Sequence, residues 1–319
     1  MSEKNISFEK IAFKWLNTVM IKSKASTYSK YVELLDKQIL PCIGAINIDL
    51  IDTKVLSDFI LSKKNNGRLD GKGGLSAKSI QDILSVINLV LNFAKTENYN
   101  VKNNIGVVRP QKNKKDIRIL KLDEQARLER YLLNNINYKT LGIILTLYTG
   151  LRIGEICALR RKNIDFEQKT INIENTIIRV KNTDDNAKSK TKVIIDTPKS
   201  LSSKRCVPIP YFIFDVFKEL VYDLPTEAFI LSANTNKFIE PRTYENNFKS
   251  YLKHANVSQI NFHSLRHTFA TRAIEAGFDV KTLSEILGHS DVGITLNVYV
   301  HSSLTLKQLN MQKLKLCCA

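Results

Sequence analysis

Apolar residues recur three and four positions apart through most of the first hundred residues, which is the spacing of amphipathic helices. Three stretches show this spacing: residues 6–21, 26–41 and 52–67. We expect Pro41 to end the second stretch, because proline interrupts a helix. A fourth and longer stretch begins at Leu75, with Ser76 as its N-cap. The pattern therefore predicts an all-helical first domain of residues 1–107.

A short basic segment with a proline and no apolar period follows this domain. We interpret residues 108–116 as a linker, which leaves residues 117–319 as a second domain. Helical spacing resumes at Leu122. A strongly apolar helix then ends at Gly150, where glycine can adopt the positive φ of a helix C-cap.

β-Branched residues alternate or cluster between turn-rich segments from residue 170 to residue 209. Four strands are predicted there: 170–173, 176–178, 193–195 and 206–209. We expect them to form one small antiparallel sheet, with a loop at residues 182–186 on its edge. Helices return at Tyr211 and again at about 243–254. The predicted fold is mainly α with a small antiparallel β-sheet, in which an α+β second domain follows the helical first domain.

The charge of the chain narrows the class of partner. The sequence has 48 Lys and Arg against 31 Asp and Glu, a formal net charge of +17. Residues 1–114 carry +8 of this charge and residues 115–319 carry +9. Such an excess favours nucleic acid over an anionic membrane surface. Because both halves are basic, we expect the protein to grip a DNA duplex from two sides.

Cysteine usage and hydropathy indicate a cytoplasmic protein. The five cysteines are odd in number and contain no C-x-x-C pair, which argues against a disulfide framework or a cysteine zinc site. The N-terminus is polar, and no run approaches the roughly 18 apolar residues of a membrane span.

Two pairs of polar residues stand where the pattern fixes their direction. His263 and Arg266 are three apart in a predicted helix, so they share one face. Arg152 follows the break at Gly150, and Glu155 lies one turn later. Taken singly, the first pair would be surface residues near a helix start, and the second an exposed ion pair of small energetic value.

Two further residues stand near the end of the chain. His289 follows Gly288 at the expected end of a helix, and Tyr299 lies ten positions later in a segment opened by Asp291. A capping histidine and a half-buried tyrosine are the ordinary interpretations. All these residues occur together and in this order, which favours a shared functional site over the ordinary interpretation of each residue.

Four motifs resemble those of the tyrosine recombinases, the phage-integrase family of site-specific DNA recombinases. They are T-G-L-R-I-G-E at 149–155, H-S-L-R-H at 263–267, L-G-H-S at 287–290 and N-V-Y at 297–299. The first half also resembles the family's helical, SAM-like core-binding domain. The sequence of residues 176–210 and around Tyr299 is similar to that of integrases of conjugative transposons and phages. This resemblance implies an enzyme that integrates and excises a mobile element.

The resemblance implies a role for each residue. Tyr299 is the nucleophile that attacks a DNA phosphate, which forms a 3′-phosphotyrosyl link and releases a 5′-hydroxyl. Arg152 and Arg266 hold the non-bridging oxygens, for which a planar guanidinium is suited. His263 and His289 donate to the same oxygens, and one of the two assists removal of the phenol proton.

Glu155 supports the site by orienting its neighbour, and elementary chemistry agrees with these roles. A free phenol has a pKa of about 10, so the nucleophile needs a cationic surround at neutral pH. Four preorganised donors around the phosphoryl oxygens can replace a metal ion. We therefore expect no cofactor and no metal. We also expect no ATP, because the covalent link conserves the phosphodiester energy.

The leaving 5′ oxygen still needs a proton, which a lysine on a β-hairpin supplies in the family. Lys199, shortly before the last predicted strand, is the best match. Lys204 is the competing choice, because the hairpin here is longer than in the simplest members.

Other functions stay open at this point. His263 and His267 have zinc-ligand spacing, but Ser264 stands where a hydrolase with this motif needs a glutamate. A non-catalytic DNA-binding relative would be expected to lack one of the seven residues, and none is missing. Type IB topoisomerases share the chemistry but differ around the helical first domain. Because the chain begins directly at the core-binding helices, an Xer-like resolution recombinase or a DNA invertase is an alternative.

The resemblance also implies partners. The substrate is double-stranded DNA, and four copies of the chain act together on two DNA sites. A tail from about residue 303 packs on a neighbouring subunit. An accessory protein of the excisionase type is a further candidate, and no membrane partner is expected.

Overall fold

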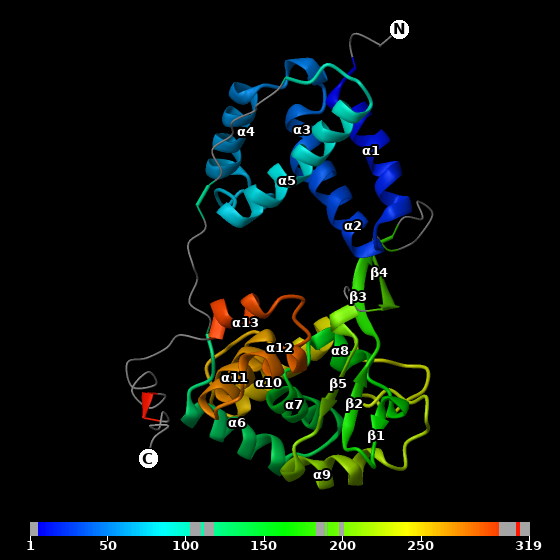
Figure 1. Cartoon of the computed structure of the whole chain (residues 1–319), viewed down its shortest axis with the longest axis vertical. Helices are drawn as coiled ribbons and strands as arrows, with labels where there is room; N and C mark the ends of the chain where they lie inside the picture. Colours follow the sequence, from blue (N-terminus) through cyan, green and yellow to red (C-terminus); the bar gives the residue numbers. More distant parts are fainter. Residues whose placement is uncertain are drawn as a thin grey trace, which may run out of the picture. The chain divides into compact units, whose positions relative to one another are not determined.

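The computed structural model describes residues 6–102, 110–111, 118–182, 189, 191–197, 201–299 and 311–312. Contacts divide the chain into two units (Figure 1). Unit 1 comprises Met1–Lys115 with Arg179–Lys192, and unit 2 comprises Asp116–Ile178 with Val193–Ala319. The predicted linker lies outside the described residues except for 110 and 111, and the predicted tail except for 311 and 312.

Unit 1 is mainly helical, and side-chain caps fix the starts of several of its helices. Its α-helices are α1 (Phe8–Lys22), α2 (Ala25–Leu34), α3 (Leu40–Ile43), α4 (Thr53–Asn66) and α5 (Ala77–Thr96). Ser76 caps α5 as predicted, since its hydroxyl accepts a hydrogen bond from the backbone N–H of Ser79 at 3.2 Å. Asp52 caps α4 in the same way through Val55, at 2.9 Å. The described helices pack their apolar stripes into one core.

The prediction that Pro41 ends the second helix is wrong. After α2 the chain continues as a π-helix, Leu35–Ile39, and then as α3, with Pro41 in the first turn of α3. Proline is tolerated there because the first N–H groups of a helix have no intrahelical acceptor. Leu35 and Ile39 are fully buried, so the apolar pattern outweighs the proline.

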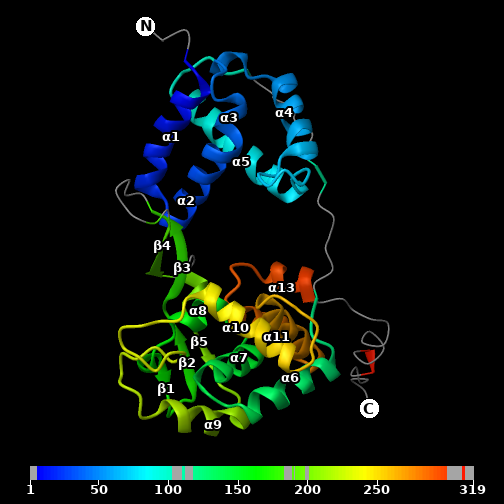
Figure 2. The same cartoon turned by 180° about the vertical axis from the view of Figure 1, so that it is seen from behind.

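Unit 2 is mainly helical. Its α-helices are α6 (Leu122–Asn134), α7 (Tyr138–Thr149), α8 (Ile153–Ala158), α9 (Tyr211–Val221), α10 (Pro241–His254), α11 (His263–Glu275), α12 (Val280–Leu287) and α13 (Val292–Tyr299). Figures 1 and 2 show α11, α12 and α13 side by side. Of these, α11 carries the H-S-L-R-H motif, and α12 ends at the L-G-H-S motif.

The described strands form two sheets, so the prediction of one sheet is wrong. The first sheet has the order β1 (Ile164–Asp165), β2 (Thr170–Ile173), β5 (Arg205–Pro208), with both neighbouring pairs antiparallel. In the second, β3 (Thr176–Lys181) pairs with β4 (Thr191–Asp196). The difference arises after β2, because β3 leaves the first sheet instead of adding to it. The edge loop predicted at 182–186 lies outside the described residues except for Asn182.

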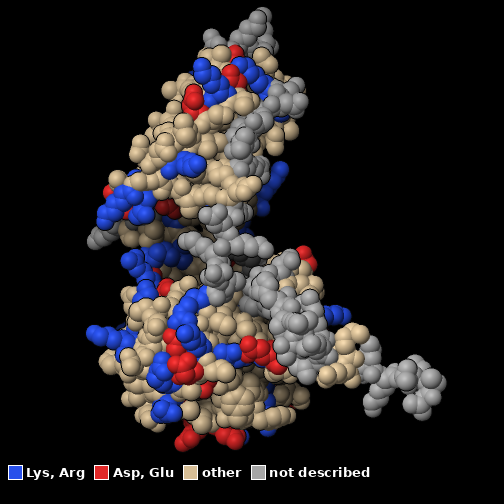
Figure 3. Space-filling model, turned by 90° about the vertical axis from the view of Figure 1, so that its left-hand side faces the viewer, with Lys and Arg blue, Asp and Glu red and all other residues tan. Residues whose placement is uncertain are grey.

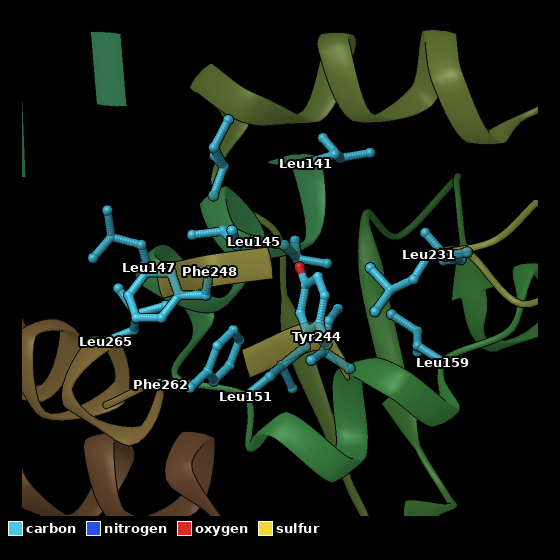
Figure 4. Packing of buried hydrophobic residues seen from close by; sticks show 14 of the residues in the cluster. Leu141, Leu145, Leu147, Leu151, Leu159, Leu231, Tyr244, Phe248, Phe262 and Leu265 are labelled. Carbon is cyan, nitrogen blue, oxygen red and sulfur yellow. The ribbon is translucent and has the colours of Figure 1, made fainter. Parts of the chain in front are cut away.

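The core of unit 2 is aromatic and aliphatic, and it includes buried side chains of α7 and α10, some of which Figure 4 labels. Tyr244 is fully buried against Phe262, with ring centroids 5.3 Å apart. Its hydroxyl donates to the backbone carbonyl of Lys139 at 2.7 Å, which satisfies the polar atom that burial would otherwise penalise. Leu265 of α11 lies in the same core, so the helix with His263 and Arg266 is anchored to the interior.

The segment that leads into α6 is tied to α11. The backbone N–H of Leu120 donates to the hydroxyl of Thr268 at 3.0 Å, and Arg272 donates to the carbonyl of Leu120 at 3.0 Å. Thr268 in turn donates to the carbonyl of Ser264 at 2.8 Å. We call these contacts the Leu120 clamp. The clamp ties α11 to the segment that precedes α6.

Basic and acidic side chains lie close together on the face drawn in Figure 3, and basic side chains occur on both units. Among the described helices, none has the length and apolar content that crossing a membrane requires.

Candidate active site

The first corner of the site lies between α7 and α8. Gly150 ends α7 with a φ of 66°, a left-handed conformation that favours glycine, as predicted. Arg152 is then the N-cap residue of α8, and its backbone N–H donates to Glu155 at 2.9 Å. The Arg152 guanidinium donates to the other carboxylate oxygen of Glu155 at 2.7 Å. The short helix α8 thus presents Arg152 at its beginning and uses Glu155 to hold it.

Glu155 is not a surface residue. Its side chain is 2% exposed, whereas that of Arg152 is 34% exposed. A second arginine, Arg205, binds both Glu155 carboxylate oxygens, at 3.0 and 2.9 Å. Burial alone would raise the pKa of Glu155, but Arg205 and Arg152 outweigh it and lower the pKa to about 2. The interpretation of Arg152 and Glu155 as an exposed ion pair is therefore wrong.

Arg266 joins the first corner to a second one at the end of α12. The residue is 1% exposed. Its guanidinium donates to the carbonyl of Gly150 at 2.8 Å and to the carbonyl of Leu287 at 2.7 Å. Both carbonyls lie at helix C-termini, where no intrahelical donor reaches them. The sequence placed Arg266 on one helix face with His263, but it did not indicate burial.

The second corner is formed by Gly288 and His289. Gly288 ends α12 with a φ of 65°, as predicted for a glycine C-cap. Its carbonyl accepts a hydrogen bond from Arg152 at 3.1 Å. The Nδ1 atom of His289 lies 2.8 Å from the hydroxyl of Thr295, which is fully buried in α13. When that hydroxyl donates to Nδ1, the other ring nitrogen carries the proton and becomes a donor.

The two histidines are neutral at pH 7 in the free protein. Partial desolvation of the rings, followed by nearby positive charges, lowers the pKa of His263 and of His289 to about 4. For His263 these charges are those of His267, Arg266 and Arg152; for His289 they begin with Arg266 and Arg152. Arg266 and Arg152 act on both rings, so these two arginines and the two histidines face one region. A bound anion would oppose this effect and raise both pKa values.

His267 lies beside His263 on α11. The two rings meet edge to face, with centroids 4.6 Å apart. Desolvation and then the charge of Arg266 also lower the pKa of His267. Within the described part of the chain, no group of three or more His, Cys, Asp and Glu residues is arranged to hold a metal ion.

Two predicted residues are described incompletely or not at all. Tyr299 is the last residue of α13, which packs on α11 and α12, but its side chain is outside the description. Lys199 lies outside the described residues. Lys204 is described, and its exposed side chain lies directly before β5.

Arg205 is the residue that the sequence analysis missed. It is the first residue of β5, in which Val207 is buried and Cys206 is exposed. Because side chains alternate along a strand, Arg205 points to the same inner side as Val207. Arg205 lies one residue before the predicted strand 206–209, so extending that strand by one position would have placed a basic residue on its inward side.

Two family models match the chain. Residues 118–305 match the phage integrase family, and residues 7–63 match the N-terminal SAM-like domain of phage integrases. The first match covers more than half of the chain and includes every residue of the site described above.

Relatives with similar sequences include recombinases and transposases. The chain is 31% identical over 249 residues to a tyrosine recombinase XerC-like protein of Caldanaerobacter subterraneus subsp. tengcongensis, covering 72% of this chain and 63% of that protein. It is 29% identical over 191 residues to the transposase of transposon Tn916 from Enterococcus faecalis, covering 54% and 45%. The chain thus spans about half to two thirds of the length of these relatives.

Solved structures with the same fold include the Tn1549 transposon integrase in complex with transposon right end DNA. The TM-score is 0.75 at 21% sequence identity, and the match covers 97% of this chain and 99% of that one. The mainly helical fold with small antiparallel sheets is shared with these integrases.

Proposed function

Because this chain belongs to the phage integrase family, we propose that it is a site-specific tyrosine recombinase that cuts and rejoins double-stranded DNA. The covalent intermediate is a 3′-phosphotyrosyl link to Tyr299. The proposed place of action is the cytoplasm, because the proposed substrate is DNA. No cofactor, metal or ATP enters the proposed reaction.

The convergence of two arginines and two histidines on the ends of α7 and α12 carries this proposal. Arg152 and Arg266 both bond to carbonyls at the end of α12, and both lower the pKa of His289. A cluster of this kind attracts an anion with several oxygens. Preorganised donors around the charge that develops on a phosphoryl group usually lower the barrier more than any other catalytic effect.

In the proposed step, the oxygen of Tyr299 forms a bond to phosphorus while the bond from phosphorus to the 5′ oxygen breaks. Arg152 and Arg266 stabilise the non-bridging oxygens. A neutral histidine is suited to take the phenol proton, and the phosphate anion raises its basicity once DNA is bound. His263 and His289 both meet this condition, because the pKa of each is about 4 in the free protein.

A nicked suicide duplex with the element's own end sequence tests this function. Wild-type protein should form a covalent protein–DNA band on a denaturing gel, and Tyr299→Phe should form none while still shifting DNA in a native gel. DNA binding by the wild type without any covalent band would favour the non-catalytic DNA-binding relative.

The proton for the leaving 5′ oxygen comes, in this proposal, from Lys199, with Lys204 as the competing residue. Sulfur at the bridging 5′ position makes the leaving group a thiolate, which needs no proton. Loss of the true general acid should therefore slow cleavage of the normal duplex strongly and cleavage of the sulfur-substituted duplex little. Comparing Lys199→Ala with Lys204→Ala on both duplexes assigns the role.

We propose integration and excision of a mobile element as the biological role. The Tn916 and Tn1549 relatives support this choice. The XerC-like relative supports the alternative of a resolution recombinase, and a DNA invertase is the other alternative. Plasmids with joined element ends, directly repeated sites or inverted sites distinguish the three by their products.

The proposed active form is a tetramer on two DNA sites. A solved lambda integrase tetramer bound to a Holliday junction supports it. The tail from about residue 303 would join neighbouring subunits, so a chain that ends at residue 302 should bind one site but fail to recombine two. An excisionase-type protein remains a candidate partner for the excision direction.

A further inference from the structure

Arg205 is almost completely buried beside the site, yet the reaction proposed above assigns it no role. Its side chain is 5% exposed. A buried arginine is costly to desolvate unless its donors are satisfied, and here they are used on three different segments of unit 2. The choice of these partners indicates what the residue does.

The first segment is α8. Arg205 donates from Nη1 and Nη2 to the two oxygens of Glu155, at 3.0 and 2.9 Å. Glu155 also accepts from the backbone N–H and the guanidinium of Arg152. One carboxylate is thus shared between two arginines, and a bidentate pair with Arg205 fixes the plane of the carboxylate. The direction of Arg152 therefore depends on Arg205 through Glu155.

The second segment is the end of α12, which precedes His289, and the third contains Ser203, the neighbour of Lys204. Arg205 donates from Nε to the carbonyl of Ile286 at 2.5 Å, and from Nη1 to the carbonyl of Ser203 at 3.2 Å. It also fills the space beside Gly288, where an added Cβ would lie 3.0 Å from Cδ of Arg205. The same side chain thus supports the turn that presents His289.

We propose that Arg205 is a positioning residue of the recombinase, which holds Arg152 and His289 in the orientation that clamps one phosphate. Arg205 acts on Arg152 through Glu155 and on His289 through the carbonyl of Ile286, without touching the DNA. This inference rests on the function proposed above, because it concerns the rate of the same covalent step.

A purely structural role makes a different prediction. A buried ion pair is weak evidence for stability, since apolar replacements of such pairs can be neutral or stabilising. If Arg205 served stability alone, Arg205→Met would change the unfolding midpoint and leave the rate constant of the folded protein intact. A positioning residue instead affects the rate constant at saturating DNA.

The experiment measures single-turnover formation of the covalent band at saturating nicked duplex. Arg205→Met should be about 100-fold slower than wild type, the loss typical of a displacement of about 1 Å in a catalytic group. Arg205→Lys keeps the charge but not the bidentate geometry, so it should recover part of that loss. The matched control is Arg160→Met, which removes an arginine from another glutamate, Glu227, and should stay within about twofold of wild type on the same grounds.

A double-mutant cycle tests the route through Glu155. If Arg205 acts through that carboxylate, the double variant Glu155→Gln, Arg205→Met should be slower than Arg205→Met by far less than the factor lost in Glu155→Gln alone. The pH profile adds a second readout. Without Arg205 the buried carboxylate loses a cation that favours its charged form, so Arg205→Met should show an acid limb in addition to the one that protonation of the proposed histidine base causes in wild type. The double variant should lack this additional limb.

Each outcome decides the inference. If wild type forms the covalent band and Arg205→Met forms it equally fast, this inference is overturned but the proposed function is not. The same holds if the rate losses of the two single variants multiply in the double variant. A wild type that forms no covalent band overturns the proposed function as well. If Arg205→Met shows no cooperative unfolding, the same comparison is made with Arg205→Lys and with the double variant, in which a neutral amide replaces the buried carboxylate.

Discussion

Two helix ends build the candidate site, and they are similar in backbone but different in surroundings. Both α7 and α12 end in a left-handed glycine, Gly150 with a φ of 66° and Gly288 with a φ of 65°. Each is followed within two residues by a proposed catalytic side chain, Arg152 or His289. Arg266 bonds to a carbonyl in each of the two corners.

The surroundings separate the two corners. A Cβ added at Gly150 would lie 2.7 Å from side-chain carbons of both Leu287 and Phe269. At Gly288 the neighbours are Arg205 and the carbonyl of Ser202, at 3.0 Å. The first corner is therefore set by close apolar packing, and the second by a polar side chain. We infer that the first corner mainly stabilises the fold, and that the second mainly affects the rate of the reaction at the site.

The largest effect is expected at the first corner. Gly150→Ala adds left-handed strain of about 1–2 kcal/mol to overpacking of about 1–3 kcal/mol. The free energy of unfolding of unit 2 should therefore fall by about 3 kcal/mol, measured by urea denaturation. A loss below about 1 kcal/mol would contradict the view that packing against Phe269 and Leu287 sets this corner.

Gly288→Ala should cost less stability, about 1–2 kcal/mol, because its contacts are longer and a polar side chain can shift. Its rate of covalent-band formation should fall more than that of Gly277→Ala, the matched control. Gly277 also has a positive φ, of 88°, but an added Cβ there would meet no described atom within 4 Å. Equal rates for the two variants would remove the distinction between the corners.

The second corner should also make stability depend on pH. The pKa of His289 is about 4 in the folded protein, below its ordinary value of 6.5. The unfolded chain therefore binds a proton first as pH falls, so the free energy of unfolding should decrease from about pH 6.5 to pH 4. His289→Asn should reduce this slope, and added sulfate should reduce it in wild type. Loss of stability from the low pKa of Glu155 should begin below about pH 4.5.

The smallest effect is expected from an exposed pair with a similar distance to that of Arg152 and Glu155. Lys37 and Glu33 approach within 2.6 Å, but both side chains are more than half exposed. Lys37→Gln should change the free energy of unfolding of unit 1 by no more than about 0.5 kcal/mol. A change above about 1 kcal/mol would show that distance, and not burial, decides the worth of such pairs here.

Local rules predicted the helix ends well. The cap at Ser76 and the left-handed glycines at 150 and 288 were found where the sequence indicated, because each depends on a few neighbouring residues. Pro41 was misread because burial of Leu35 and Ile39 carries the helix through it. The pairing of strands into two sheets depends on contacts far apart in sequence.

The sequence analysis singled out Arg152, Arg266 and His289, but it missed Arg205 and did not indicate how these residues are connected. The bond from Arg205 to Glu155 joins positions 50 residues apart, and the bond from Arg266 to Gly150 joins positions 116 apart. The acceptors of Arg266 are backbone carbonyls, which no residue type identifies. Burial of Glu155 likewise followed from the packing around α8, and the pattern of charged residues contained no sign of it.

The Leu120 clamp limits how far unit 2 can be shortened from its N-terminal side. A fragment that begins at residue 118 retains the N–H and the carbonyl of Leu120, and with them the bonds to Thr268 and Arg272. A fragment that begins at Leu122 keeps all of α6 but loses both bonds. Secondary structure alone would suggest cutting at Leu122. The hydrogen bonds indicate instead that α11 needs the residues that precede α6.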